Sequence, residues 1–275
     1  MVETPSIDLP DGFRMIYRIA GPETDVPLLL LHGLGANHVQ FEQDVAHFSQ
    51  SRRVIQPDMR GHGDTGFPPD PKIEDFTCAK FAGDLAYLLD HLKIDKIDVV
   101  GNSLGGNIAL ELMTLRPGLV RSLMTFGTTY QLKVPRFLLV IRDIIYFFLG
   151  RKLARWAAEQ TSKTPHGREV LTRTFEKMDR RVSKLVSPNI CRFDYRAVAE
   201  QFSGPILLLQ CEDDSAINRT LKSTLKTLSG LPNAQVMPFK TGGHCANVDD
   251  PERFHRIIDE FLCTVDSKDR PARFS

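Results

Sequence analysis

The segment Ile97-Asp-Val-Val-Gly101-Asn-Ser103-Leu-Gly105-Gly106 decides the fold class of this chain. Its apolar start is typical of a strand buried on both faces, and Leu104–Leu115 behind it has the apolar spacing of a helix. Gly101 and Gly105 let the backbone turn tightly around Ser103 where a strand passes directly into a helix. The bare Gly-x-Ser-x-Gly pattern arises by chance in roughly one chain in ten of this length, so its weight comes from the strand and helix around it.

Strands and helices alternate along most of the chain. A Pro10-Asp11-Gly12 turn predicts a hairpin, and short apolar runs predict strands at Pro27–His32, Arg53–Asp58, Ser122–Phe126, Pro205–Cys211 and Ala234–Phe239. Apolar residues at helical spacing predict helices at Glu74–Leu92, Leu104–Leu115, Arg219–Leu228 and Pro251–Val265. This order predicts an α/β fold with a mostly parallel central sheet and helices on both faces.

The alternation stops between Tyr130 and Phe202, where no strand is evident and apolar residues recur at helical spacing. We interpret residues 131–202 as a helical lid inserted into a core made of residues 1–130 and 203–265. Insertions of this kind cluster at binding sites. The polar residues 266–275 are expected to form a flexible tail.

Composition and charge exclude several classes of protein. Lys and Arg number 35 against 34 Asp and Glu, a formal net charge of +1 that does not favour nucleic acid as a partner. The 5 cysteines form no Cys-x-x-Cys pair, which favours reduced thiols in a cytoplasmic protein over disulfides or zinc. The most apolar stretch, residues 137–149, is too short to cross a bilayer, so no stable membrane insertion is expected. Clustered histidine and carboxylate spacing is missing, so no metal is expected.

A serine hydroxyl needs an adjacent base to act as a nucleophile, and the base needs a carboxylate to hold its tautomer. His244 follows the last predicted strand directly, and Asp213 and Asp214 both follow the strand Pro205–Cys211. Loops after parallel strands meet at one edge of a sheet, so these groups are expected to converge on Ser103. The order of these residues along the chain does not decide whether Asp213 or Asp214 is the catalytic acid.

An acyl-transfer site also needs two N–H donors for the oxyanion. The first is expected from Leu104, directly after Ser103. The second is expected from Leu34 in the loop His32-Gly-Leu-Gly35. The mechanism built from these groups requires no cofactor.

The loop at residues 32–35, the serine turn, the aspartates and His244 follow one another in an order that resembles the α/β-hydrolase superfamily, in its esterase, lactonase and carbon–carbon hydrolase branch. The resemblance runs from Ser6 to Val265, and the blocks that carry it are His32-Gly33, Asp58–Gly63, Gly101–Gly105, Gly243-His244 and Asp249–Phe254. It implies a serine nucleophile at Ser103 and a base at His244. Family members commonly read Gly-x-x-Asp after the seventh strand; here Cys211 stands where Gly is usual. Counting from Cys211 favours Asp214 as the acid, with Asp213 as the alternative.

The substrate is expected to be chosen by the lid. Its apolar residues that could line a pocket over Ser103 are Phe137, Leu138, Ile141, Ile145 and Phe148. Such a pocket predicts a small ester or lactone with an apolar acyl part, for example an acyl-homoserine lactone. The same residues could instead pack the lid on the sheet or on a second copy of the chain, as a homodimer.

Two other functions remain open from the sequence. The first is a carbon–carbon bond hydrolase of a ring-cleavage product, with Arg136, Arg142 or Arg192 facing the substrate carboxylate. The second is a ligand receptor on the same fold with slow turnover. The receptor predicts near-stoichiometric product release, whereas an enzyme releases many products per site.

Overall fold

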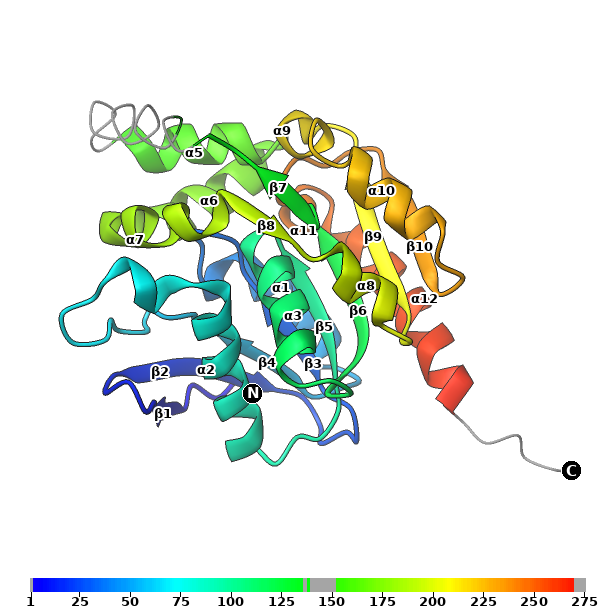
Figure 1. Cartoon of the computed structure of the whole chain (residues 1–275), viewed down its shortest axis with the longest axis horizontal. Helices are drawn as coiled ribbons and strands as arrows, with labels where there is room; N and C mark the ends of the chain where they lie inside the picture. Colours follow the sequence, from blue (N-terminus) through cyan, green and yellow to red (C-terminus); the bar gives the residue numbers. More distant parts are fainter. Residues whose placement is uncertain (1, 136–137, 139–151, 270–275) are drawn as a thin grey trace, which may run out of the picture.

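An eight-stranded sheet runs through the centre of the computed structural model, which describes residues 2–135, 138 and 152–269 (Figure 1). The strand order is β1-β2-β4-β3-β5-β6-β9-β10. β1 and β2 form the antiparallel hairpin, β2 pairs antiparallel with β4, and all other neighbours are parallel. The strands are β1 (Ser6–Asp8), β2 (Arg14–Ala20), β3 (Leu28–Leu31), β4 (Val54–Pro57), β5 (Ile97–Asn102), β6 (Val120–Phe126), β9 (Ile206–Cys211) and β10 (Ala234–Phe239).

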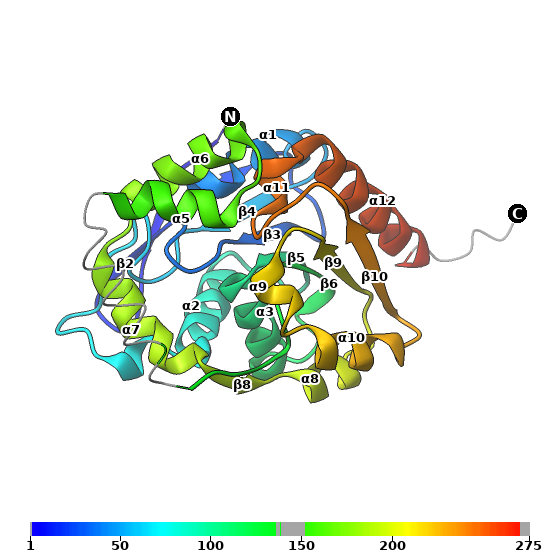
Figure 2. The same cartoon turned by 90° about the horizontal axis from the view of Figure 1, so that it is seen from above.

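The helices that cover the sheet lie on both of its faces (Figure 2). They are α1 (Glu42–Phe48), α2 (Cys78–His91), α3 (Leu104–Leu115), α8 (Arg196–Gln201), α10 (Lys222–Ser229) and α12 (Pro251–Asp269). Short turns of helix are η1 (His38–Phe41), η2 (Ile73–Phe76), α9 (Ser215–Asn218) and α11 (Ala246–Asp249). Within the described ranges, no helix combines the length and apolar character that crossing a membrane requires.

The four leucines of β3 show how the core is divided. Side chains alternate between the two faces of a strand, and all four leucines are fully buried. Leu28 and Leu30 pack in the cluster that contains residues of α1 and α12. Leu29 and Leu31 pack in the cluster that contains residues of α2 and α3. The expected parallel sheet with helices on both faces is therefore confirmed.

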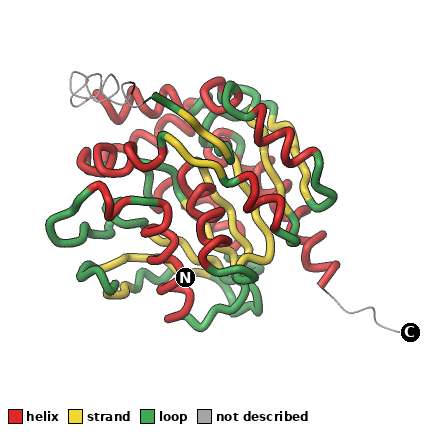
Figure 3. The backbone as a smooth tube through the Cα atoms, viewed as in Figure 1, coloured by secondary structure: helices red, strands yellow, loops and turns green. Residues whose placement is uncertain are grey.

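The described residues of the insertion after β6 include further helices, which gather at one end of the sheet (Figure 3). They are α5 (Leu153–Thr161), α6 (Pro165–Glu176) and α7 (Arg180–Ile190), and we call these helices and the turns between them, residues 153–190, the cap. The expectation of an all-helical insertion was wrong, because β7 (Gln131–Lys133) and β8 (Arg192–Asp194) form a separate antiparallel pair at its two ends. Strands of three residues are too short to show a clear alternation. α8, the last helix of the predicted lid range, contacts α3 and α10 of the core.

Two helix predictions also need correction. The helix expected over Glu74–Leu92 is interrupted at Thr77, whose side chain accepts from Lys80 N and caps α2. The expected tail begins later than residue 266, because α12 continues to Asp269. Asp266 pairs with Arg121 at 2.6 Å and with Arg52 at 2.9 Å, which ties the last turns of α12 to the core. Residues 270–275 lie outside the described part of the chain.

Candidate active site

Ser103 lies on a strained turn between β5 and α3. Its backbone has φ +52° and ψ −116°, a region that residues other than glycine rarely adopt. A Cβ at Gly101 would overlap the backbone of Gly106, and one at Gly105 would overlap the carbonyl of Leu31. The two glycines therefore allow the close packing that the turn needs, as the sequence predicted.

The structure joins His244 to Asp214. His244 Nδ1 lies 2.7 Å from Asp214 Oδ2, and Asp214 is buried, whereas Asp213 is exposed. An ionised carboxylate can only accept hydrogen bonds, so His244 Nδ1 is the donor in this contact. In a neutral imidazole, Nε2 then carries no hydrogen and can accept a proton. Of the two acids that the sequence left open, the geometry favours Asp214.

Asn102, directly before Ser103, connects the loops around the site. Its Nδ2 donates to the carbonyls of His244 at 2.9 Å and Phe126 at 3.2 Å. Its Oδ1 accepts from Gln40 Nε2 at 3.0 Å, and Gln40 Oε1 accepts from Gly33 N at 3.4 Å. The serine turn is thus tied to the histidine loop (residues 241–246) and to the oxyanion loop (residues 32–35). Sequence reasoning missed both amides, since no spacing rule brings residues 40, 102 and 244 together.

The two expected oxyanion donors come shortly after the carboxyl ends of neighbouring strands, one at the start of a helix and one in a loop. Leu104 begins α3, so its N–H is among those that no helix carbonyl satisfies. Leu34 lies beyond the end of β3, which pairs directly with β5. The predicted donors therefore follow the carboxyl ends of two adjacent parallel strands, β3 and β5, at the same edge of the sheet.

The buried His32 bonds to the oxyanion loop, and the ring of a second buried histidine, His62, lies 5.0 Å from the His32 ring. His32 Nε2 accepts from Met59 N at 3.1 Å, so its Nδ1 carries the proton and donates to the Gly33 carbonyl. His62 Nδ1 donates to the Arg60 carbonyl at 2.9 Å. Burial lowers the pKa of His32, and burial together with the neighbouring His32 ring lowers the pKa of His62 to about 3. Both rings are therefore neutral in the folded state near pH 7.

We expect His62 to make the fold sensitive to acid. Its pKa falls from 6.5 to about 3 on folding, so the unfolded chain binds more protons between these values and stability decreases as pH falls below 6.5. The free energy of unfolding should lose about 2 kcal/mol from this group between pH 7 and pH 5. In His62→Asn, which keeps an N–H donor, urea titrations should show a shallower decrease. An equally steep decrease in both proteins would contradict this prediction.

Two buried cysteines lie near the histidine loop. Burial, reinforced by the charge of Asp214, raises the pKa of Cys211 to about 12. Burial, reinforced by the charge of Asp249, raises the pKa of Cys245 well above its usual range. Both thiols stay protonated near neutral pH, so neither supplies a thiolate nucleophile.

Of the five residues expected to line the lid pocket, Leu138 lies within the described part of the chain. Phe137, Ile141, Ile145 and Phe148 lie outside the described residues, and Leu138 is 42% exposed. Other cap side chains lie close to the oxyanion loop: a Cβ at Gly35 would overlap Met178 Sδ and touch the Phe175 ring. The cap therefore places apolar groups beside the expected oxyanion donors, at positions that the sequence analysis did not single out.

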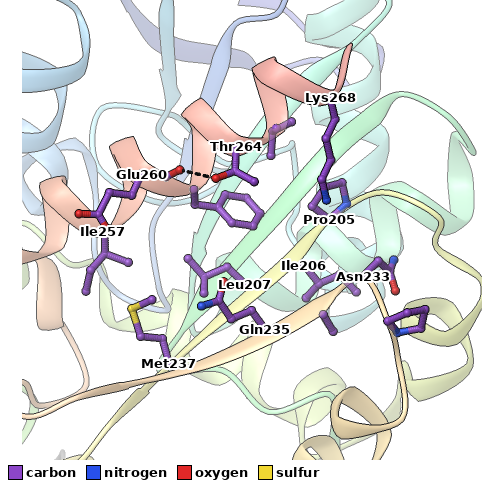
Figure 4. Close-up of a pocket in the computed structure, with 14 residues that line it drawn as sticks. Pro205, Ile206, Leu207, Asn233, Gln235, Met237, Ile257, Glu260, Thr264 and Lys268 are labelled. Carbon is purple, nitrogen blue, oxygen red and sulfur yellow. Dashed lines mark hydrogen bonds between the residues drawn. The ribbon is translucent and has the colours of Figure 1, made fainter. Parts of the chain in front are cut away.

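A groove between α12 and the last two strands lies away from these groups (Figure 4). It is lined by Ile206 and Leu207 at the start of β9, by Gln235 and Met237 of β10, and by Ile257 of α12. Asp214 follows the opposite end of β9, at Cys211. The groove is therefore distinct from the candidate active site.

His38, Asp58 and Asp64 lie close enough together to resemble a metal site. Arg18 Nη1 lies 3.2 Å from Asp58 Oδ2, and Arg18 Nη2 lies 2.6 Å from Asp64 Oδ2. Asp58 also accepts from the backbone N–H groups of His38 and Asp64. These partners account for both oxygens of Asp58, so the described contacts make the cluster an ion-pair network centred on Asp58.

Comparisons with known proteins support the fold described above and a hydrolase activity. A family model described as alpha/beta hydrolase fold matches residues 26–251. The chain is 31% identical over 260 residues to 2-hydroxymuconate semialdehyde hydrolase from Pseudomonas putida, covering 88% of each chain. It is 26% identical over 263 residues to a Pseudomonas savastanoi pv. phaseolicola protein whose name assigns it carbamate hydrolysis, covering 91% of this chain and 98% of that one. The enol-lactonase structure from Burkholderia xenovorans LB400 superposes with a TM-score of 0.80 at 21% identity, covering 94% of this chain and 100% of that one. By its sequence and its fold, this chain belongs to the alpha/beta hydrolase family.

Proposed function

We propose that this hydrolase cleaves a carboxylic ester or lactone through a covalent acyl-enzyme on Ser103. The observation that carries the proposal is the 2.7 Å contact between His244 Nδ1 and Asp214 Oδ2, on a loop that Asn102 ties to the serine turn. An oriented histidine ring, on a loop bonded to the residue before a serine on a strained turn, is what nucleophilic catalysis requires.

In the proposed reaction, Ser103 Oγ attacks the substrate carbonyl while His244 Nε2 takes its proton. The N–H groups of Leu34 and Leu104 stabilise the oxyanion, and loss of one such donor typically costs about 3 kcal/mol of transition-state stabilisation. His244 then protonates the leaving alcohol. It next activates a water molecule, which attacks the acyl-enzyme and releases the acid.

The proposed substrate has an apolar acyl part. Phe175 and Met178 lie against the oxyanion loop, and Phe175 packs against the cluster of Val170 and Cys245. An acyl chain that leaves the reacting carbonyl toward the cap would meet these groups. An acyl-homoserine lactone is one member of this class.

Lengthening the acyl chain of a p-nitrophenyl ester series should raise kcat/KM. Each buried methylene contributes about 0.8 kcal/mol, which corresponds to an increase of up to roughly fourfold per methylene. Met178→Ala should flatten the series, whereas Leu115→Ala, on an exposed part of α3, should not. A flat or falling series in the parent protein would exclude the apolar acyl preference.

Carbon–carbon bond hydrolysis of a ring-cleavage product is the second candidate. It is favoured by the 31% identity with 2-hydroxymuconate semialdehyde hydrolase, which exceeds the 21% identity with the enol-lactonase. Of the arginines expected to face a substrate carboxylate, Arg192 is exposed on β8, and Arg136 and Arg142 lie outside the described residues.

One screen separates these functions. Purified protein is assayed with short and long esters, lactones and vinylogous diketo acids, with Ser103→Ala as the control. Preference for esters or lactones supports the first proposal, and preference for a diketo acid supports the second. Many product molecules per site would exclude a slow-turnover receptor, whereas release of one product per site would favour it.

A further inference from the structure

The carboxylate of Asp249 joins the cap to the histidine loop. Asp249 ends α11 and is buried. Its Oδ2 accepts from Gly243 N at 2.7 Å, directly before His244. Its Oδ1 accepts from the Ser162 hydroxyl and from the backbone N–H groups of Lys163 at 2.9 Å and Thr164 at 3.2 Å, all in the turn between α5 and α6.

Other contacts hold the same cap helices against the site. Cys245 N, directly after His244, donates to the Thr161 carbonyl at 3.2 Å. Asn37 Nδ2, in the segment that follows the oxyanion loop, donates to the Thr174 carbonyl of α6 at 3.0 Å. The backbone on both sides of His244 is therefore bonded either to the end of α5 or to the carboxylate that holds the α5–α6 turn.

We propose that Asp249 is a positioning residue for His244: its carboxylate fixes the histidine loop to the α5–α6 turn, so the position of the base depends on the cap. This inference rests on the proposed function of His244. A catalytic side chain must be held within about 0.5 Å of its productive position, and displacement by about 1 Å can lower the rate roughly 100-fold.

Asparagine at this position tests the role of the second carboxylate oxygen. A carboxylate accepts hydrogen bonds on both oxygens, whereas an amide accepts on one and donates from the other. In Asp249→Asn, either Gly243 N or the α5–α6 turn would face an NH₂ group and lose its acceptor. The matched control is Asp250→Asn. Asp250 accepts from Thr241 Oγ1, at the start of the histidine loop, and from Arg253 N, and in the bonds described it contacts neither the cap turn nor Gly243. Because the Thr241 hydroxyl can also accept from an amide, asparagine keeps both bonds at this position.

The experiment measures kcat and KM for the best ester found in the screen, with thermal melting of each variant. Asp249→Asn should lower kcat by about 100-fold with KM changed less than about threefold, and Asp250→Asn should stay within about twofold of the parent. Ser162→Ala removes one donor to Asp249 Oδ1 and leaves the bond between Oδ2 and Gly243 N, so it should lower kcat by several-fold. This variant replaces Asp249→Asn in the experiment if Asp249→Asn does not fold.

Two results would overturn the inference. The first is a folded Asp249→Asn whose kcat stays within about twofold of the parent, or, if that variant does not fold, a Ser162→Ala with unchanged kcat. The second is a loss confined to KM, which would indicate a role in substrate binding. Failure of the proposed function is distinguishable, because the parent protein would then show no activity that depends on Ser103.

Discussion

Replacing Ser103 with alanine should lower kcat for ester hydrolysis by at least about 10⁴-fold. The hydroxyl is the proposed nucleophile, and without it the oxyanion donors and the base have no acyl-enzyme to act on. The strained backbone at φ +52° is retained by alanine, so the free energy of unfolding should change little. Initial rates with a p-nitrophenyl ester and a urea titration measure the two effects.

The matched control for this change is Ser229→Ala. Ser229 is an exposed residue at the end of α10, and its hydroxyl donates to the Lys226 carbonyl. This variant should keep full activity. Retention of more than about a tenth of the activity by a folded Ser103→Ala would remove the serine mechanism.

Asp214→Asn should lower kcat by about 10⁴-fold, whereas Asp213→Asn should change it by less than about threefold. The amide can donate to His244 Nδ1, which would then hold the proton on Nε2 and leave the ring unable to accept one from Ser103. Asp213 is exposed, and the described contact of His244 is with Asp214. The same ester assay on both variants makes the comparison.

Asp214 also caps helix α9, so the stability of Asp214→Asn must be measured beside its activity. Asp214 Oδ1 accepts from Ile217 N at 3.2 Å and caps this short helix. Asparagine is also a good capping residue, so the melting temperature should change by only a few degrees. A larger loss of activity in Asp213→Asn than in Asp214→Asn would assign the acid to Asp213.

The central sheet and the serine turn could be predicted because their signals are local. Four consecutive leucines between a proline and a glycine are typical of a strand buried on both faces, and β3 places them there. The two glycines around Ser103 are required by contacts within the turn and with the neighbouring strand. In these cases, short-range sterics and burial determine the structure.

The features that the sequence did not reveal depend on contacts between distant residues. Nothing near residue 266 indicates that α12 continues, because the stabilising partners are Arg52 and Arg121. In the sequence, Asp249 stands out only as the first residue of the block Asp249–Phe254, and its bonds to residues 162–164 follow from the placement of the cap. The roles of Asn102 and Gln40 could not be predicted for the same reason, because their partners are distant in the sequence.

The central claim is that His244 activates the Ser103 hydroxyl for covalent attack on a carbonyl. The most direct test is labelling of the protein with a fluorophosphonate, followed by mass spectrometry of its peptides. We expect one adduct, on the peptide that contains Ser103, with no adduct in Ser103→Ala and a labelling rate lowered by at least about 100-fold in His244→Ala. An adduct on another residue, or an equal labelling rate in His244→Ala, would contradict the claim.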